Sequence, residues 1–212
     1  MDIGVYTFVE NTPDPSTGRL LDPAQRLRDL MEEIALADQV GLDVFGIGEH
    51  HRPDFLASAP QMLLAAAAER TRRIRLSTAV TVLSSDDPVR VYEQFATLDL
   101  LSGGRVDFAA GRGYDSREYA PFHVDFTDNQ SIFEEGMEVI QKLWAAKDRI
   151  SHHGKHYQFD DVRITPKPIQ NPMPAYIGSF SKPSIELAAR LGYGLIVAPF
   201  AAAMSYGGLK QV

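Results

Sequence analysis

The sequence predicts an α/β protein of the (β/α)8 TIM-barrel type, incomplete at its C-terminus. Strand-like segments alternate with longer helix-like segments, which is typical of a parallel sheet with helical crossovers. No glycine-rich dinucleotide-binding turn follows the first strand, and this favours a barrel over an open doubly wound sheet. A full barrel has eight strands in about 250 residues, so we expect residues 1–212 to form one barrel domain with about six of the eight units.

The first unit combines an alternating strand with a well-marked helix start. Apolar and polar residues alternate over Ile3–Phe8, which predicts a half-buried strand. After a polar loop, Asp22 is suited to cap a helix, Pro23 to fill its first position and Gln25 to complete a capping box. Apolar residues at helical spacing continue to Gly41, where we expect the helix to end.

The second and third units follow the same order. Val44–Gly48 is a short apolar strand, and Ala59–Arg70 is an alanine-rich helix. Ile74–Leu83 contains β-branched residues throughout, which predicts the third strand. Asp87 and Pro88 repeat the cap-and-proline signal, so the third helix is expected to begin there.

The fourth unit is followed by an irregular segment. Arg105–Ala110 is the fourth strand, and a polar, aromatic stretch over 112–127 separates it from a helix near Ser131–Trp144. The segment 151–174 is rich in histidine and proline. Because proline cannot donate to a central ladder, we expect this segment to be an excursion or small hairpin outside the barrel.

The last predicted elements are a strand, a helix and a short strand. Pro174–Ser179 is the fifth strand, and Ser181–Leu191 is the fifth helix with Gly192 as its C-cap. Leu195–Ala198 is the sixth strand. The remaining residues, Ala201–Val212, have the pattern of a sixth helix at its beginning.

Composition excludes several classes of function. The chain is 44% hydrophobic with a formal net charge of −7 and has no basic patch, so nucleic acid and anionic membranes are not expected as partners. It has no cysteine, which excludes disulfides, thiolate catalysis and cysteine-ligated zinc. We see no signal peptide and no apolar run of the roughly 18 residues that cross a bilayer, so a cytoplasmic protein is expected.

The end of the second strand carries the first candidate for chemistry. In a barrel, catalytic groups lie where strands end, and Glu49, His50 and His51 follow this strand. A histidine there can act as a general base or hydrogen-bond a bound intermediate. Alternatively, one histidine supports the loop and the other faces the core. A metal site with Glu49 is less favoured, because adjacent histidines on a strand point to opposite faces.

Two further segments are suited to a phosphate group. Arg112 lies between Gly111 and Gly113 after the fourth strand, and a guanidinium matches phosphate geometry. Ser181 and Ser184 begin the fifth helix, whose N-terminus offers free N–H groups. The alternatives are a turn with a surface arginine and an ordinary serine N-cap.

Other polar and aromatic groups admit two interpretations. His152, His153 and His156 are spaced like metal ligands, but no fourth ligand is evident and a solvated turn is preferred. The aromatic residues of 112–127 either line a pocket lid or pack within their own loop.

Four segments in order resemble one known family, the bacterial luciferase-like flavin-dependent monooxygenases, which are (β/α)8 barrels. The segments are Gly48–His51, Leu101–Phe108 continuing through Gly111–Gly113, Pro166–Gln170 followed by Pro174, and the strand–helix unit Tyr176–Gly194. Their combined order is more specific than any one of them, and the resemblance covers essentially the whole chain.

The resemblance implies an FMN site. His50 corresponds to the family's active-site histidine beside the flavin ring, and no metal is implied. The residues expected near the flavin phosphate are Arg112, Tyr114, Ser181 and Ser184. The residues expected behind the isoalloxazine ring are Thr78, Ala79 and Val80, with a non-proline cis peptide at Ala79–Val80.

The implied reaction uses reduced FMN and O2 to oxygenate a small organic substrate through a flavin C4a-peroxide. The family commonly takes reduced flavin from a separate reductase, and its members suggest a homodimer that packs through the second and third helices. Two other functions remain open: a non-catalytic flavin-binding protein on the same scaffold, and a metal-dependent hydrolase barrel using Glu49, His50 and His51.

The family's barrel continues beyond the units found here, so the first strand would lack its closing neighbour. Three outcomes are compatible with this: a truncated remnant, a barrel completed by a partner chain, or a short relative that binds flavin without turnover.

Overall fold

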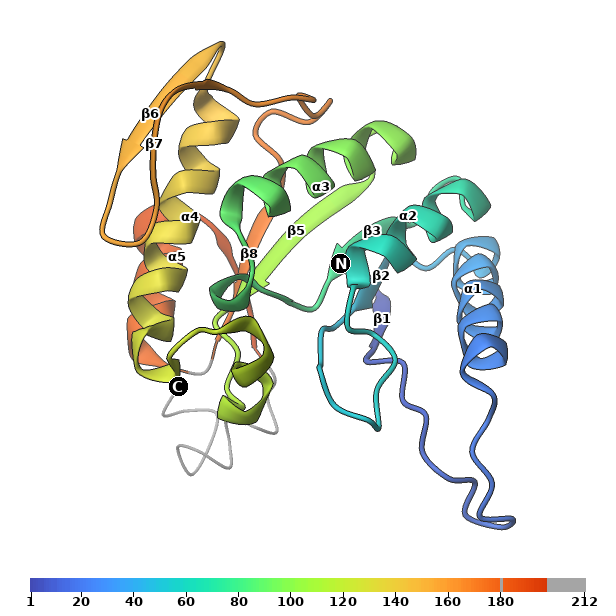
Figure 1. Ribbon diagram of the computed structural model, residues 1–212. Coiled ribbons are helices and arrows are strands. Elements are labelled where there is room, and N and C mark those ends of the chain that lie inside the picture. The colour runs from blue at the N-terminus through green and yellow to red at the C-terminus, as the bar shows by residue number, and fades with distance from the viewer. Residues whose placement is uncertain (180, 198–212) are drawn as a thin grey trace.

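The computed structural model describes residues 1–179 and 181–197 (Figure 1). The strands of its main sheet are β1 (Gly4–Thr7), β2 (Val44–Ile47), β3 (Arg75–Thr78), β4 (Thr81–Val82), β5 (Val106–Gly111), β8 (Ala175–Gly178) and β9 (Gly194–Ile196). The α-helices are α1 (Pro23–Val40), α2 (Pro60–Arg70), α3 (Pro88–Ser102), α4 (Asn129–Ala145) and α5 (Lys182–Leu191). The expected strand end at Ala198 and the helix start over Ala201–Val212 lie outside the described residues.

The main sheet confirms the predicted fold class. Six parallel strands in the order β1-β2-β3-β5-β8-β9 form a half-barrel, and β4 pairs with β5 beside this path. Strand order along the sheet follows chain order, as expected for successive right-handed crossovers. All carboxyl ends therefore meet at one edge, where β2, β3, β5 and β8 end side by side.

The helices cover the outer face of this sheet (Figure 1). In α1, Asp22 accepts a hydrogen bond from the Gln25 N–H and Gly41 has a left-handed φ of 87°, as predicted. The predicted capping box is incomplete, because the Gln25 side chain donates to Asp29 instead of pairing with the Asp22 backbone. The core between helices and sheet is formed by large apolar side chains that include Leu30, Ile34, Ile47, Leu64, Leu76, Phe95, Phe108, Phe133 and Ile177. No helix in the described ranges is long and apolar enough to cross a membrane.

The prediction of one continuous strand over Ile74–Leu83 is wrong, because the segment is broken after Thr78. β3 stops at Thr78, a cis peptide joins Ala79 to Val80, and Leu83–Ser85 form a 3-10 turn. The cis peptide itself was expected from the family resemblance. The backbone break makes β4 pair with β5 rather than continue β3, which brings Ala79 and Val80 into the mouth of the half-barrel.

The histidine- and proline-rich segment contains a hairpin of β6 (Arg149–His153) and β7 (Gln158–Arg163), which lies outside the sheet against α4 (Figure 1). The preference for a solvated histidine turn is wrong for His152, which is 3% exposed. Its ring lies 2.9 Å from the Lys142 ammonium and 3.2 Å from the Glu135 carboxylate. These contacts tie the hairpin to α4 and explain why the histidine is buried.

Candidate functional site

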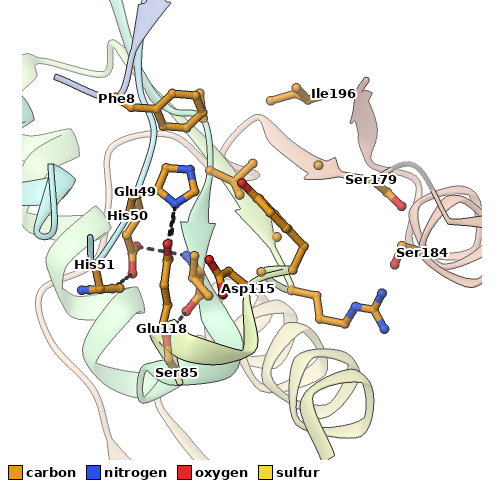
Figure 2. Close-up of a pocket in the computed structure, with 18 of the residues that line it drawn as sticks. Phe8, Glu49, His50, His51, Ser85, Asp115, Glu118, Ser179, Ser184 and Ile196 are labelled. Carbon is orange, nitrogen blue, oxygen red and sulfur yellow. Dashed lines mark hydrogen bonds and ion pairs between the residues drawn. The ribbon is translucent and has the colours of Figure 1, made fainter. Parts of the chain in front are cut away.

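A cavity of about 300 Å³ opens at the carboxyl ends of the strands. Its walls come from the ends of β1, β2, β5 and β8, from the Ala79–Val80 turn and from the loop after β5 (Figure 2). Most of its lining is apolar. A concave apolar site with a few converging polar groups at this face of a barrel is the expected place for a ligand.

His50 is held in this cavity by a carboxylate. Glu118, on the 3-10 turn Ser116–Glu118 after β5, lies 2.9 Å from His50 Nδ1, and both side chains are 10% exposed. Because the carboxylate only accepts, Nδ1 carries a proton, and in the neutral ring the lone pair is then on Nε2. Nε2 is turned away from Glu118 (Figure 2). The ring also lies between Phe8 and Phe55, with centroids 4.7 and 4.8 Å away.

The neighbouring histidine has a different carboxylate. His51 Nε2 lies 2.9 Å from Glu49 Oε1. This hydrogen bond raises the pKa of His51, although partial burial opposes the shift. The two histidines therefore do not converge. Among residues 1–179 and 181–197, no three His, Asp or Glu side chains are grouped so that they could hold a metal ion, and the hydrolase alternative gains no support.

Ala79 and Val80 form part of the cavity wall, beside Gly111 and Gly178. A side chain at Gly111 would collide with Val80 Cγ2, and one at Gly178 would approach Val80 Cγ1 to 2.6 Å. The absence of side chains at these two glycines thus leaves the space that the Val80 methyl groups occupy. Thr78 does not line the cavity: its buried hydroxyl donates to the Ala109 carbonyl at 2.6 Å.

The opposite end of the cavity is cationic and rich in hydroxyl groups. Arg112, Ser181 and Ser184 all line it. Within the described part of the chain, the half-buried Arg112 side chain makes no hydrogen bond or ion pair. The Ser181 side chain forms no cap bond to the backbone of α5 and instead lies 3.2 Å from the Ser184 hydroxyl. Among the described residues, no side chain therefore caps the N-terminus of α5, which shares the cavity with the Arg112 guanidinium.

The structure thus brings His50, Arg112, Ser181 and Ser184 to one cavity, as the barrel topology predicted. Tyr114 is at its rim, 65% exposed, with its ring 6.0 Å from that of His50. The sequence analysis missed Glu118. The loop that carries it was noted for its polar and aromatic residues, but no spacing in that loop indicates which acid reaches the histidine.

Comparison with known families agrees with this geometry. Residues 1–207 match the family model described as luciferase-like monooxygenase. The chain belongs to the luciferase-like monooxygenase family. The monooxygenase RslO1 from Streptomyces bottropensis superposes with a TM-score of 0.84 at 26% identity, covering 98% of this chain and 67% of RslO1.

Relatives in the luciferase-like family include F420-dependent and flavin-dependent enzymes. An F420-dependent glucose-6-phosphate dehydrogenase of Beutenbergia cavernae is 34% identical over 177 residues, covering 80% of this chain and 52% of that protein. The oxygenase component of a flavin-dependent trigonelline monooxygenase of Acinetobacter baylyi is 28% identical over 203 residues, covering 94% and 54%. The chain spans about half the length of these relatives. The family therefore comprises flavin- or F420-dependent oxidoreductases.

Proposed function

We propose that this protein is an FMN-dependent monooxygenase that uses reduced FMN and O2 to oxygenate a small organic substrate. The observation that carries this proposal is the polarity of the cavity. At one end lie a guanidinium that pairs with no residue of 1–179 or 181–197 and a helix N-terminus without a side-chain cap, and the carboxylate-bound His50 lies at the other. A cofactor with a phosphate tail and a flat ring has this same division of charge.

The residues present fit such a cofactor. Arg112, Ser181, Ser184 and the N–H groups of α5 would hold the phosphate. Val80, beside two glycines, offers an apolar surface on which a ring can lie. Reduced FMN, when bound, would supply the electrons that activate O2 for transfer of one oxygen atom to the substrate.

The chain's own groups have two tasks in this reaction. His50 Nε2 would accept or return a proton at the reacting centre, because Glu118 keeps the proton of the ring on Nδ1. Phe8 and Phe55 pack against the histidine ring and exclude water from it. A separate reductase is the proposed source of reduced flavin.

A second candidate is an F420-dependent dehydrogenase, favoured by the 34% identity to the Beutenbergia cavernae enzyme. F420 is a deazaflavin that also carries a phosphate, so the cationic end of the cavity does not separate the two. In this case His50 would exchange a proton with a substrate hydroxyl during hydride transfer, and O2 would play no part.

Fluorescence titration with FMN and with F420, oxidised and then anaerobically reduced, distinguishes these functions. We expect saturable binding of FMN that Arg112→Ala weakens about 10- to 100-fold, because a charge-assisted phosphate contact is lost. Arg28→Ala, on the exposed face of α1, is the control and should bind like the wild type. Binding of F420 alone would favour the dehydrogenase, and a folded protein that binds neither would refute the flavin assignment.

A further inference from the structure

The segment that carries Val80 is held by contacts on both sides. Before it, the Ala79 N–H donates to the Ile47 carbonyl at 2.8 Å. After it, the Gln61 side chain donates to the Thr81 hydroxyl at 3.1 Å. The Val82 N–H donates to Glu49 Oε2 at 3.0 Å. Among these contacts in the described ranges, Glu49 is the charged acceptor, and it comes from the end of β2.

Glu49 also contacts His51, which lines the same cavity. Its second carboxylate oxygen, Oε1, binds His51 Nε2 at 2.9 Å, and the Glu49 side chain is only 8% exposed. A buried carboxylate is costly unless it is paired and hydrogen-bonded. His51 supplies the opposite charge, and the Val82 N–H supplies a hydrogen bond. Both oxygens of Glu49 are thereby satisfied.

Val80 has little space in which to move if the hydrogen bond between the Val82 N–H and Glu49 is lost. Its two methyl groups occupy the space left by Gly111 and Gly178, whose own side-chain positions would collide with them. A shift of the chain at Val82 would therefore move Val80 against the backbone of β5 or β8, and would change the surface on which a flat ligand rests.

We propose that Glu49 is a positioning residue, which fixes the cavity wall at Val80 by holding the Val82 amide and uses His51 as its counter-ion. This inference rests on the proposed flavin site, which it deepens. Glu49 is not in contact with the reacting atoms in this role. It acts through the hydrogen bond to the Val82 backbone, so the length of its side chain should affect flavin binding more than its charge does.

Two conservative variants of Glu49 separate the effect of side-chain length from the effect of charge. Glu49→Asp keeps the carboxylate but shortens the side chain by one methylene, so the oxygen no longer reaches the Val82 N–H. Glu49→Gln keeps the length and an acceptor oxygen but removes the charge that pairs with His51. Glu93→Gln is the matched control, because Glu93 is a partly buried glutamate of α3 that pairs only with Arg90 among the described residues.

Amide hydrogen exchange of Val82, measured by NMR on the flavin-free protein, is the first readout. We expect exchange about tenfold faster in Glu49→Asp and within about threefold of the wild type in Glu49→Gln and Glu93→Gln. The second readout is the FMN titration together with the visible circular dichroism of bound flavin. Glu49→Asp should weaken binding about tenfold and alter the spectrum, whereas Glu49→Gln should restore both.

The outcomes are distinct. Equal exchange in all variants overturns the proposal. A Glu49→Gln variant that is as impaired as Glu49→Asp also overturns it, because side-chain length alone would then not account for the effect. Faster exchange with unchanged flavin binding and spectrum also overturns it, since Glu49 would be only structural. A wild-type protein that binds no flavin refutes the proposed function and this inference with it, whereas binding that no Glu49 variant alters refutes this inference alone.

Discussion

The pairing of His50 with Glu118 is the feature that makes the histidine useful in catalysis. The carboxylate fixes the ring nitrogen that carries the proton, and Phe8 and Phe55 fix the plane of the ring. A histidine on a strand end without such partners would sample both tautomers and several rotamers. Loss of either partner should therefore affect turnover more than cofactor binding.

We predict that His50→Ala lowers product formation about 100-fold or more, and that Glu118→Gln lowers it about tenfold, with FMN affinity within about threefold of the wild type. Product formation is measured by mass spectrometry with reduced FMN, O2 and a panel of small neutral ketones and alkenes. Wild-type turnover in His50→Ala would contradict the assigned role. Flavin binding without any product in the wild type would favour the non-catalytic flavin protein.

The Glu49–His51 pair should make stability depend on pH. The pKa of His51 is raised by the hydrogen bond to Glu49 despite partial burial. A raised pKa in the folded state gives a contribution that is complete below the unfolded value of about 6.5 and is lost as pH rises through the folded value. Urea unfolding at pH 6 and pH 9 should therefore show a larger difference between wild type and His51→Gln at pH 6.

The control for this experiment is His153→Gln, whose histidine is 65% exposed and pairs with an exposed Asp160. It should show little difference at either pH, because exposed pairs contribute little. If His51→Gln destabilised the protein more at pH 9 than at pH 6, the pKa of His51 would be lowered in the folded state, which contradicts the prediction.

The rule that functional groups lie at the carboxyl ends of barrel strands predicted which residues line the cavity, but not which partners each of them has. His50 and Arg112 line the same cavity because parallel strands share one carboxyl edge. Glu118 was not found, because its position depends on the path of the loop after β5. Thr78 was expected behind the flavin ring; its side chain bonds to β5 instead, and no alternation pattern distinguishes those two directions.

At the scale of elements, helix boundaries were the most predictable feature. Asp87 caps α3 by accepting from the Val89 and Arg90 N–H groups, and Gly103 closes it with a left-handed φ of 69°. These are local signals, confined to a few residues. The break between β3 and β4 was placed inside a predicted strand because β-branched residues run through it. Its position is set by neighbours distant in the chain, such as Gln61.

The junction of α1 with β3 depends on one carboxylate. Asp38 accepts hydrogen bonds from the Arg72, Arg73 and Ile74 N–H groups at 2.7–2.9 Å. Burial opposes ionisation, but these bonds prevail and lower the pKa of Asp38. Stability from this group should therefore be present above the unfolded pKa of about 3.9 and be lost as pH falls through the folded value.

We predict that Asp38→Ala lowers the free energy of unfolding by about 2–4 kcal/mol, because several backbone donors lose a charged acceptor. Asp38→Asn keeps one acceptor oxygen and should lose less. Urea unfolding at pH 7 measures both, and Glu32→Ala on the exposed face of α1 is the control. Equal stability of Asp38→Ala and wild type would show that water replaces the carboxylate without cost.

Across the whole molecule, function and stability occupy opposite edges of the sheet. The cavity lies at the carboxyl edge, whereas Gln170 binds Asp99 and the Val106 carbonyl at the amino edge. Arg75 joins this network through Asp107 and Gln170. The Pro166–Gln170 segment, which carried part of the family resemblance, therefore anchors the excursion to the barrel and does not contribute to the site.

The outer surface of α2 and α3 supports the proposed homodimer. Met62 on α2 is 72% exposed, and Leu100 and Leu101 on α3 are 46% and 48% exposed. These helices pack against each other, so a second copy could cover both at once. Burial of such side chains favours association, and a charge placed among them opposes it.

We predict that light scattering coupled to size-exclusion chromatography finds a dimer at micromolar concentrations, and that Leu101→Asp shifts it toward the monomer. Leu36→Asp is the control, because Leu36 is also exposed, at 58%, but belongs to α1 and not to the two helices of the proposed contact. Leu101 is already in contact with water, so the substitution should leave the cooperativity of urea unfolding intact in the monomer. A monomeric wild type, or a dimer that only Leu36→Asp dissociates, would place the contact elsewhere.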